Sequence, residues 1–123
     1  MNNNELQAHR EYFPNGQLKT EWFEKDGKIE GWRRHWLKNG QLFSEAEYRD
    51  GLTNGVLREW SEDGRLILLA HTKDGEFHGH YQAWWDDGLR KEEGVYFHGK
   101  PTNGYRWYRV NGEFWKERSD ESS

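Results

Sequence analysis

The chain has 123 residues and no cysteine, with 18 basic and 22 acidic residues and a formal net charge of -4. This length predicts a single domain, and the absence of cysteine excludes a disulfide framework and any thiolate metal site. The mean hydropathy of -1.30 is that of a very polar chain, but 16% aromatic residues, including 8 tryptophans, exclude the composition typical of a disordered chain.

The N-terminus and the hydropathy pattern bear on localisation. The opening Met-Asn-Asn-Asn-Glu has neither the positive charge nor the apolar stretch of a signal peptide, and no apolar run reaches the length of a membrane span. Only 33% of the residues are hydrophobic, which predicts a fold without a thick two-layer core. We expect a cytoplasmic protein.

A 24-residue repeat organises the chain. Glycines recur in three series with this period, and one inserted residue displaces the last member of the third series. The series are Gly16, Gly40, Gly64, Gly88 and Gly112; then Gly27, Gly51, Gly75 and Gly99; then Gly31, Gly55, Gly79 and Gly104. The pattern predicts one domain of hairpin repeats over residues 1–118, followed by a disordered tail over 119–123.

Two kinds of connection alternate along the repeat. Asn or Asp precedes each glycine of the first series, and such pairs are typical of the two-residue type I′ turn. The segment from Asp26 to Gly31 and its later equivalents predict longer loops at the other ends of the strands. Helical periodicity is absent. The predicted fold class is therefore all-β, a single elongated, twisted antiparallel β-meander of about ten strands, each roughly seven or eight residues long.

A two-residue turn would fix which residues face each other across a hairpin. Around Asn39-Gly40 the predicted pairs are Leu37–Leu42, Trp36–Phe43 and Arg34–Glu45. The same offset places Arg or Gln opposite Glu in four hairpins, as Arg10–Glu21, Arg34–Glu45, Gln82–Glu93 and Arg106–Glu117. A directly opposed charge pair contributes about 0.2–1 kcal/mol, so these pairs support the register independently of the turns.

One predicted face carries an aromatic residue four positions before each turn glycine. This column is Tyr12, Trp36, Trp60, Trp84 and Tyr108. Alternation places the Arg and Glu pairs on the same face, where guanidinium groups can stack on the rings. The opposite face is predicted to carry Leu18, Leu42, Leu66 and Phe114. Both faces are thus half apolar, which suits a single sheet whose large side chains cover one another.

The third and fourth units depart from the repeat. In the third, Leu69 lies opposite Arg58 within the apolar segment 66–70, which is either a central strand covered by sheet curvature or a patch for a partner or for self-association. In the fourth, Arg90 holds the usual leucine position and Leu89 precedes it, so a register shift or bulge would return Leu89 to its face. The final strand is predicted to be an exposed edge that can accept a partner strand.

The sequence holds no pattern that predicts catalysis. His78 and His80 lie two residues apart, but no carboxylate stands at a zinc-like spacing and His78 falls in a predicted loop, so we expect no metal site. His35 faces Ser44 without an orienting acid, so we expect no nucleophilic catalysis there. Each Glu of the predicted cross-strand pairs already has a basic or amide partner, so we expect none of them to act as a catalytic acid or base. The acidic balance disfavours nucleic-acid binding. We expect a protein that is not an enzyme and uses no cofactor.

The hairpin unit resembles the bacterial variant of the MORN repeat. The shared pattern is an aromatic residue, Asn/Asp-Gly, x-Leu-x-x-Glu and then Asp-Gly-x-x-x-Gly, and its best copies are YFPNGQLKTE at 12–21 and WLKNGQLFSE at 36–45. The similarity spans residues 9–118. It implies an elongated, twisted antiparallel sheet and implies relatives that are predicted antitoxin or immunity components in bacteria. Other MORN-repeat proteins are scaffolds or are linked to membrane lipids.

Our hypothesis is a cytoplasmic protein-binding module that neutralises a partner toxin, with aromatic and arginine side chains as interface anchors. The predicted partner-binding residues are Trp36, Trp60, Trp84, Tyr108, Arg34, Arg58 and Arg106. One alternative is a scaffold that self-associates through an edge strand or through the surface of Leu66, Ile67, Leu68 and Leu69. Another is a lipid-surface-binding protein, which the charge of -4 disfavours because anionic membranes attract basic patches.

Overall fold

The computed structural model describes residues 5–119, which form one antiparallel sheet. Within this range no helix is present that could cross a lipid bilayer. The strands are β1 (Gln7–Tyr12), β2 (Leu18–Lys25), β3 (Lys28–Ile29), β4 (Gly31–Trp36), β5 (Leu42–Arg49), β6 (Leu52–Trp60), β7 (Leu66–Lys73), β8 (Glu76–Trp84), β9 (Arg90–Phe97), β10 (Lys100–Pro101), β11 (Arg106–Tyr108) and β12 (Phe114–Glu117).

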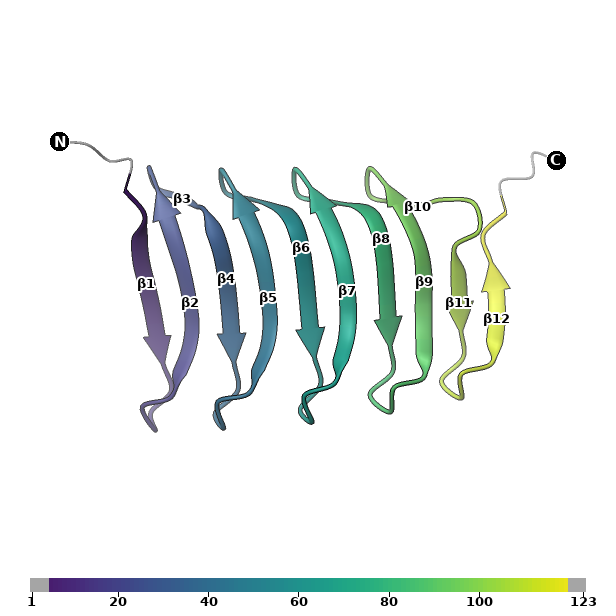
Figure 1. Ribbon diagram of the computed structural model, residues 1–123, viewed down its shortest axis with the longest axis horizontal. Coiled ribbons are helices and arrows are strands. Elements are labelled where there is room, and N and C mark those ends of the chain that lie inside the picture. The colour runs from purple at the N-terminus through teal and green to yellow at the C-terminus, as the bar shows by residue number, and fades with distance from the viewer. Residues whose placement is uncertain (1–4, 120–123) are drawn as a thin grey trace.

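The strand order follows the chain from β1 to β12, so the sheet is an open meander. Ten strands form the main path, and the two-residue strands β3 and β10 pair beside β2 and β9. Figure 1 shows the hairpin turns alternating between the two ends of the strands, with β1 and β12 at opposite sides of the sheet. The predicted all-β meander of about ten strands is confirmed. Residues 120–123 of the predicted tail lie outside the described residues.

The turn types are the reverse of our prediction. At Asn39-Gly40 the Gly40 N–H donates to the Leu37 carbonyl at 2.9 Å, and the Leu37 N–H donates to the Gln41 carbonyl at 2.8 Å. Gly40 has a φ of 91°, whereas Asn39 stays at negative φ. This is a type I turn closed by a glycine bulge. The Asn39 side chain stabilises this three-residue loop, because its Oδ1 accepts the Gln41 N–H at 2.9 Å.

The two-residue type I′ turns lie at the opposite ends of the strands. Asp26 and Gly27 have φ values of 53° and 77°, and Lys25 pairs directly with Lys28 across the loop. The equivalent residues with positive φ are Asp50-Gly51, Asp74-Gly75 and His98-Gly99. The loops that we predicted to be longer are therefore the tighter ones. Both central residues of a type I′ turn need positive φ, which Asp and Gly tolerate better than most residues.

We call the turns of the Asn39-Gly40 type, at the bottom of Figure 1, the lower turns, and the type I′ turns the upper turns. A bulge shifts the register near each lower turn. Arg34 pairs with Glu45 as predicted, and so do the equivalent Arg10–Glu21, Gln82–Glu93 and Arg106–Glu117. Beyond the bulge, Trp36 pairs with Leu42. The predicted pairs Trp36–Phe43 and Leu37–Leu42 are wrong, because the three-residue turn leaves one additional residue on the second strand.

This bulge changes the distribution of side chains between the two faces. We call the face with Arg34 and Glu45 the arginine face, and the opposite one, with Tyr81 and Tyr105, the tyrosine face. Trp36 is two residues from Arg34 on one strand and therefore shares its face. The leucine column was predicted on the other face, but Leu18, Leu42, Leu66 and Phe114 are the cross-strand partners of Tyr12, Trp36, Trp60 and Tyr108 and lie on the arginine face. The Arg106 guanidinium over the Phe114 ring, at 5.6 Å, is consistent with this placement.

No second layer of described residues covers the sheet, so few side chains are buried. Most of the buried ones lie along the middle of the tyrosine face. Tyr105 is the largest fully buried side chain in the described residues. Its ring lies over Gly94, where an added Cβ would come 2.4 Å from the Tyr105 Cδ2 atom. The small residues Ala46, Ala70 and Ala83 are also buried. Small side chains next to large rings thus replace the two-layer core that the composition excludes.

The apolar strand and the irregular fourth unit can now be placed. Leu66 to Leu69 are half-buried on the central strand β7, and Ala70 is buried. No register shift returns Leu89 to the leucine position, so that prediction is wrong: Arg90 pairs with Trp84 and takes the place of the leucine. Leu89 instead reaches the turn of the following hairpin, where its Cδ1 atom is 3.3 Å from the position of a Cβ on Gly112.

Candidate partner-binding surface

Two grooves near the lower turns of the described sheet offer concave, aromatic surface. The C-terminal groove has a volume of about 500 Å³, and its lining includes Leu68, Tyr81, Trp84, Trp85 and Lys91. The N-terminal groove has a volume of about 540 Å³, and its lining includes Phe13, His35, Trp36, Leu37 and Phe43. Both are in the size range of small-molecule or side-chain binding pockets.

The two grooves are the same site repeated along the sheet. Moving along the chain by two repeats takes nine lining positions of the N-terminal groove onto nine lining positions of the C-terminal groove. For example, Trp36 corresponds to Trp84, and Phe43 corresponds to Lys91. Because four strand spacings of about 4.8 Å separate equivalent strands, the grooves are roughly 19 Å apart. The repeat therefore places two equivalent grooves at a fixed separation.

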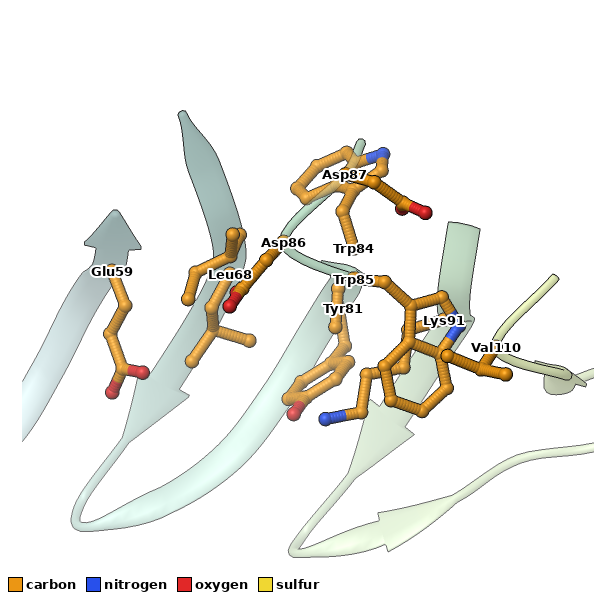
Figure 2. Close-up of a pocket in the computed structure, with 11 residues that line it drawn as sticks. Glu59, Leu68, Tyr81, Trp84, Trp85, Asp86, Asp87, Lys91 and Val110 are labelled. Atoms are coloured by element: carbon orange, nitrogen blue, oxygen red, sulfur yellow. The ribbon is translucent and has the colours of Figure 1, made fainter. Parts of the chain in front are cut away.

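The C-terminal groove combines rings with acidic side chains. Figure 2 shows the Glu59 carboxylate on one side and the Trp85 ring and Lys91 amine on the other. The Lys91 ammonium lies 4.8 Å from the Trp85 ring centroid, and the Trp85 indole N–H donates to the Arg109 carbonyl at 3.0 Å. These contacts fix the indole in place. Asp86 adds a further negative charge, so the groove suits an apolar group that carries a positive charge.

The N-terminal groove is less acidic and contains a histidine. His35 Nδ1 and Thr20 Oγ1 lie 3.2 Å apart, and the His35 ring is 5.9 Å from that of Phe43. Burial lowers the pKa of His35, with a smaller effect from Arg33, so the imidazole is neutral at pH 7. Lys19 lies 5.6 Å from the Phe13 ring centroid. The arrangement suits apolar contacts with a few hydrogen bonds.

The predicted aromatic anchors fall into two groups. Trp36 and Trp84 line the grooves. Trp60 is half-buried on the central strand β6, and Tyr108 is only 7% exposed. The Tyr108 hydroxyl donates to Glu93 at 2.7 Å, and the Arg90 guanidinium lies 5.1 Å from its ring. The structure thus places Trp36 and Trp84 at equivalent positions beside the two grooves, with side chains that alternation assigns to the arginine face, whereas Tyr108 is held within the sheet.

The three predicted arginines form ion pairs on the arginine face. Arg34 and Arg58 both donate to Glu45, at 2.9 Å each, and form an Arg–Glu–Arg ladder across three strands. Arg106 donates to Glu117 at 2.8 Å. The stacking differs from the expected pattern, because Arg34 lies 4.8 Å from the ring of Trp32 and not over Trp36.

The first hairpin is the segment that comparison with known families recognises. Residues 8–23 match the family model of the MORN repeat variant. No curated protein and no solved structure matched the chain. The matched segment covers most of β1 and β2, and residues 5–119 contain four further hairpins whose strands pair at the equivalent positions. The MORN match therefore lies on one unit of a structural repeat that continues through the described chain.

An aromatic cluster on the tyrosine face was missed in the sequence. Phe77, Tyr81, Tyr96 and Tyr105 contact one another, with ring centroids 5.1–6.2 Å apart. Tyr81 and Tyr105 are one repeat apart and occupy the same position in successive 24-residue units. Their period could have revealed them, but attention to the column near the turns obscured this second column in the middle of the strands.

This cluster predicts that the protein loses stability at alkaline pH. Burial raises the pKa of Tyr81 to about 12 and also raises that of Tyr105, while an unfolded tyrosine titrates near pH 10. The unfolded chain therefore releases these protons first, so stability is complete below about pH 10 and falls as the pH rises toward 12. The measurement is the urea midpoint at about pH 9 and pH 11. Tyr81→Phe should reduce the fall, Tyr12→Phe should not, and an unchanged midpoint in the original protein would contradict the prediction.

The histidines near the upper turns do not form a metal cluster with carboxylates. Among the described residues no group of three His, Cys, Asp or Glu side chains is arranged to hold a metal ion. His78 lies on β8 and not in a loop, which corrects the sequence prediction. Its ring contacts those of Phe97 and His98 at 5.1 and 4.8 Å, and its Nδ1 accepts the His98 N–H at 3.3 Å.

Proposed function

We propose that this chain is a cytoplasmic, non-enzymatic protein-binding module, and that it acts as an immunity or antitoxin protein that occludes a partner toxin. The observation that carries the binding role is the recurrence of one aromatic groove at two places that are two repeats apart. The toxin-neutralising role rests on the resemblance of the hairpins to the bacterial MORN variant, and the family match at residues 8–23 supports only the MORN repeat variant itself, for the first unit.

The grooves favour a partner with two separated contact elements. Glu59, Asp86 and Asp87 make the C-terminal groove acidic, so it suits an apolar side chain next to a basic one. Lys19 and Lys38 line the N-terminal groove, which suits an apolar side chain next to an acidic one. A partner that fills both grooves must span roughly 19 Å along the sheet. Opposite charge preferences at the two positions would fix its orientation.

The proposed anchors are the rings of Phe43 and Trp85 on the tyrosine face, and Trp36 and Trp84 border the same grooves from neighbouring positions whose side chains belong to the arginine face. Partly exposed aromatic side chains in concave surfaces are typical of interface hot spots. The other predicted interface residues, Trp60, Tyr108, Arg34, Arg58 and Arg106, lie on the arginine face, where each is half-buried, buried or paired with a carboxylate. In this proposal they keep the sheet rigid so that the grooves stay in position.

The test begins with capture of a partner from the native host by the full chain, followed by co-expression of the captured protein. Growth inhibition by the captured protein and rescue by this chain would support the antitoxin role. Trp85→Ala and Phe43→Ala are expected to weaken binding at least about tenfold, because hot-spot truncation typically costs more than about 1–2 kcal/mol. Phe97→Ala is the matched control, since Phe97 is exposed on β9 and lines neither groove.

The outcomes separate the two parts of the proposal. Binding that depends on Trp85 and Phe43, without growth inhibition by the partner, would keep the binding module and reject the antitoxin role. Binding that is unaffected by either groove variant, while both variants retain the far-ultraviolet circular dichroism of the original protein, would reject the grooves as the binding site.

A further inference from the structure

The two outer strands of the sheet have the correct directions to pair with each other between two copies of the chain. The sheet path begins at β1 and ends at β12, and no described strand lies beyond either. In Figure 1 the arrow of β1 points down and that of β12 points up. Placed beside β1 of a second copy, β12 would therefore make an antiparallel pair, as at every other position of the meander. Exposed edges of this kind are templates for strand addition.

The repeat specifies the register of that pair. Where one hairpin meets the next inside the sheet, a Glu lies opposite an Arg in three of the described junctions, as Glu21–Arg34, Glu45–Arg58 and Glu93–Arg106. Glu117 lies one repeat after Glu93, and Arg10 lies one repeat before Arg34. Continuing the repeat across the edge thus places Glu117 of one copy opposite Arg10 of the next.

The side chains at this position have the charges of the three internal junctions and can adopt the geometry of the junction between β5 and β6. Glu45 accepts Arg34 through Oε1 and Arg58 through Oε2. Glu117 accepts Arg106 through Oε1 at 2.8 Å, which leaves Oε2 in the role that receives the arginine of the next hairpin. By the same shift of one repeat from the internal pairs, Lys116 meets Glu11 of the second copy. Two neighbouring pairs of opposite charge therefore fall in register.

The backbone groups also match. The Arg118 N–H donates inward to the Tyr105 carbonyl, and the Phe13 N–H donates inward to the Gln17 carbonyl. Because successive residues of a strand direct their N–H groups to opposite edges, the backbone groups of Glu117 and Arg10 face outward. At the internal junction Glu21 and Arg34 occupy the corresponding positions and pair with each other. The unpaired edges can therefore continue the hydrogen-bond ladder without a shift.

Exposed rings at the two edges complete the match. At the internal junction between β9 and β11, the Arg90 guanidinium lies 5.1 Å from the Tyr108 ring. The residues one repeat further on are Phe114 and, in the second copy, Tyr12. These side chains are 55% and 58% exposed in the single chain. Pairing of the edges would bring them together and remove apolar surface from water.

We propose that this protein self-associates head to tail, with β12 of one copy adding to β1 of the next and Glu117 opposite Arg10. The interface joins two different surfaces, so successive copies extend one open sheet and do not close a symmetric dimer. Each copy adds ten strands, or roughly 48 Å, to the assembly. The two grooves recur in every copy, and the N-terminal groove, which Phe13 lines, lies next to the joined edge.

The test is sedimentation velocity of the full chain over a range of micromolar concentrations. We expect a series of species that grows with concentration. Arg10→Glu and Glu117→Arg should each weaken association about tenfold, because each places like charges opposite each other. Mixing the two variants, or combining them in one chain, should restore it, since opposite charges then face each other again. Arg49→Glu makes the same charge change on the interior strand β5 and should have no effect.

Circular dichroism checks that each variant is folded. If either edge variant fails to fold, the exchange of Glu11→Lys and Lys116→Glu tests the neighbouring pair in the same way. A monomer at all concentrations would overturn the proposal. So would association that survives both single variants, or a mixture of the two that stays monomeric, because either result would place the contact elsewhere.

Discussion

Replacing Tyr105 with alanine is expected to lower the free energy of unfolding by about 3–5 kcal/mol. Tyr105 is fully buried, and its ring lies 5.2 Å from that of Tyr96 and 4.8 Å from that of Trp107. It also covers Gly94, so its removal would open a cavity over bare backbone. A sheet without a second layer has few other buried contacts to compensate. Urea unfolding followed by tryptophan fluorescence measures the loss.

Two further variants separate the ring from the hydroxyl. Tyr105→Phe keeps the ring and removes the hydrogen bond from the hydroxyl to Glu92, which is 3.1 Å long, so it should cost only about 1 kcal/mol. Tyr12→Ala truncates an exposed tyrosine and should cost less than about 0.5 kcal/mol. If Tyr105→Ala were no more destabilising than Tyr12→Ala, the tyrosine cluster would not be the main source of stability in the C-terminal half.

Glu45→Ala is expected to destabilise the protein by about 2–3 kcal/mol. Glu45 is only 8% exposed and accepts hydrogen bonds from Arg34 and Arg58 on the strands at either side. Removal of the carboxylate would leave two guanidinium groups close together without the negative charge between them. Because the ladder joins three strands, the loss should appear as a lower urea midpoint for the whole sheet.

Glu21→Ala is the control for this prediction. Glu21 accepts one hydrogen bond, at 2.7 Å, from the exposed Arg10 at the edge of the sheet. Exposed ion pairs contribute about 0–1 kcal/mol, so its loss should be the smaller of the two. Equal losses for Glu21→Ala and Glu45→Ala would show that the position of Glu45 between two arginines has no special weight.

The fold could be predicted from the sequence because the repeat constrains it many times over. Two of the three glycine series fix the two sets of turns, and pairs such as Arg34–Glu45 select the alignment of the strands between them. A one-residue slip would move every such pair to opposite faces. The identities of the turn residues and the opposed charges therefore agree on a single meander, and the structure has the same pairs.

The turn types could not be read from the dipeptides alone. Asn39-Gly40 and Asp26-Gly27 look equivalent in sequence, but Asn39 has negative φ and its side chain accepts the N–H of Gln41, whereas Asp26 has positive φ. Whether that hydrogen bond forms depends on how many residues close the loop. The difference of one residue produces the bulge, and the bulge moves Leu42 to the arginine face.

The grooves depend on the same detail. Phe43 would lie opposite Trp36 in the predicted register, but the bulge turns its ring toward His35 on the other face. The concave site near each of the two turns arises from this reversal. Trp36 and Trp84 were predicted from their column, whereas Phe43 and Trp85 were assigned to no site because the predicted register gave them no shared surface.

The single-layer arrangement has a consequence for how the molecule can change in length. The main contacts join neighbouring strands, and the chain never returns to a strand that it has already passed. Gain or loss of one repeat unit would therefore lengthen or shorten the molecule by about 10 Å without rearranging the remainder. The distance between two equivalent points on the sheet is therefore a whole multiple of the repeat length, and evolution can change it by adding or removing whole units.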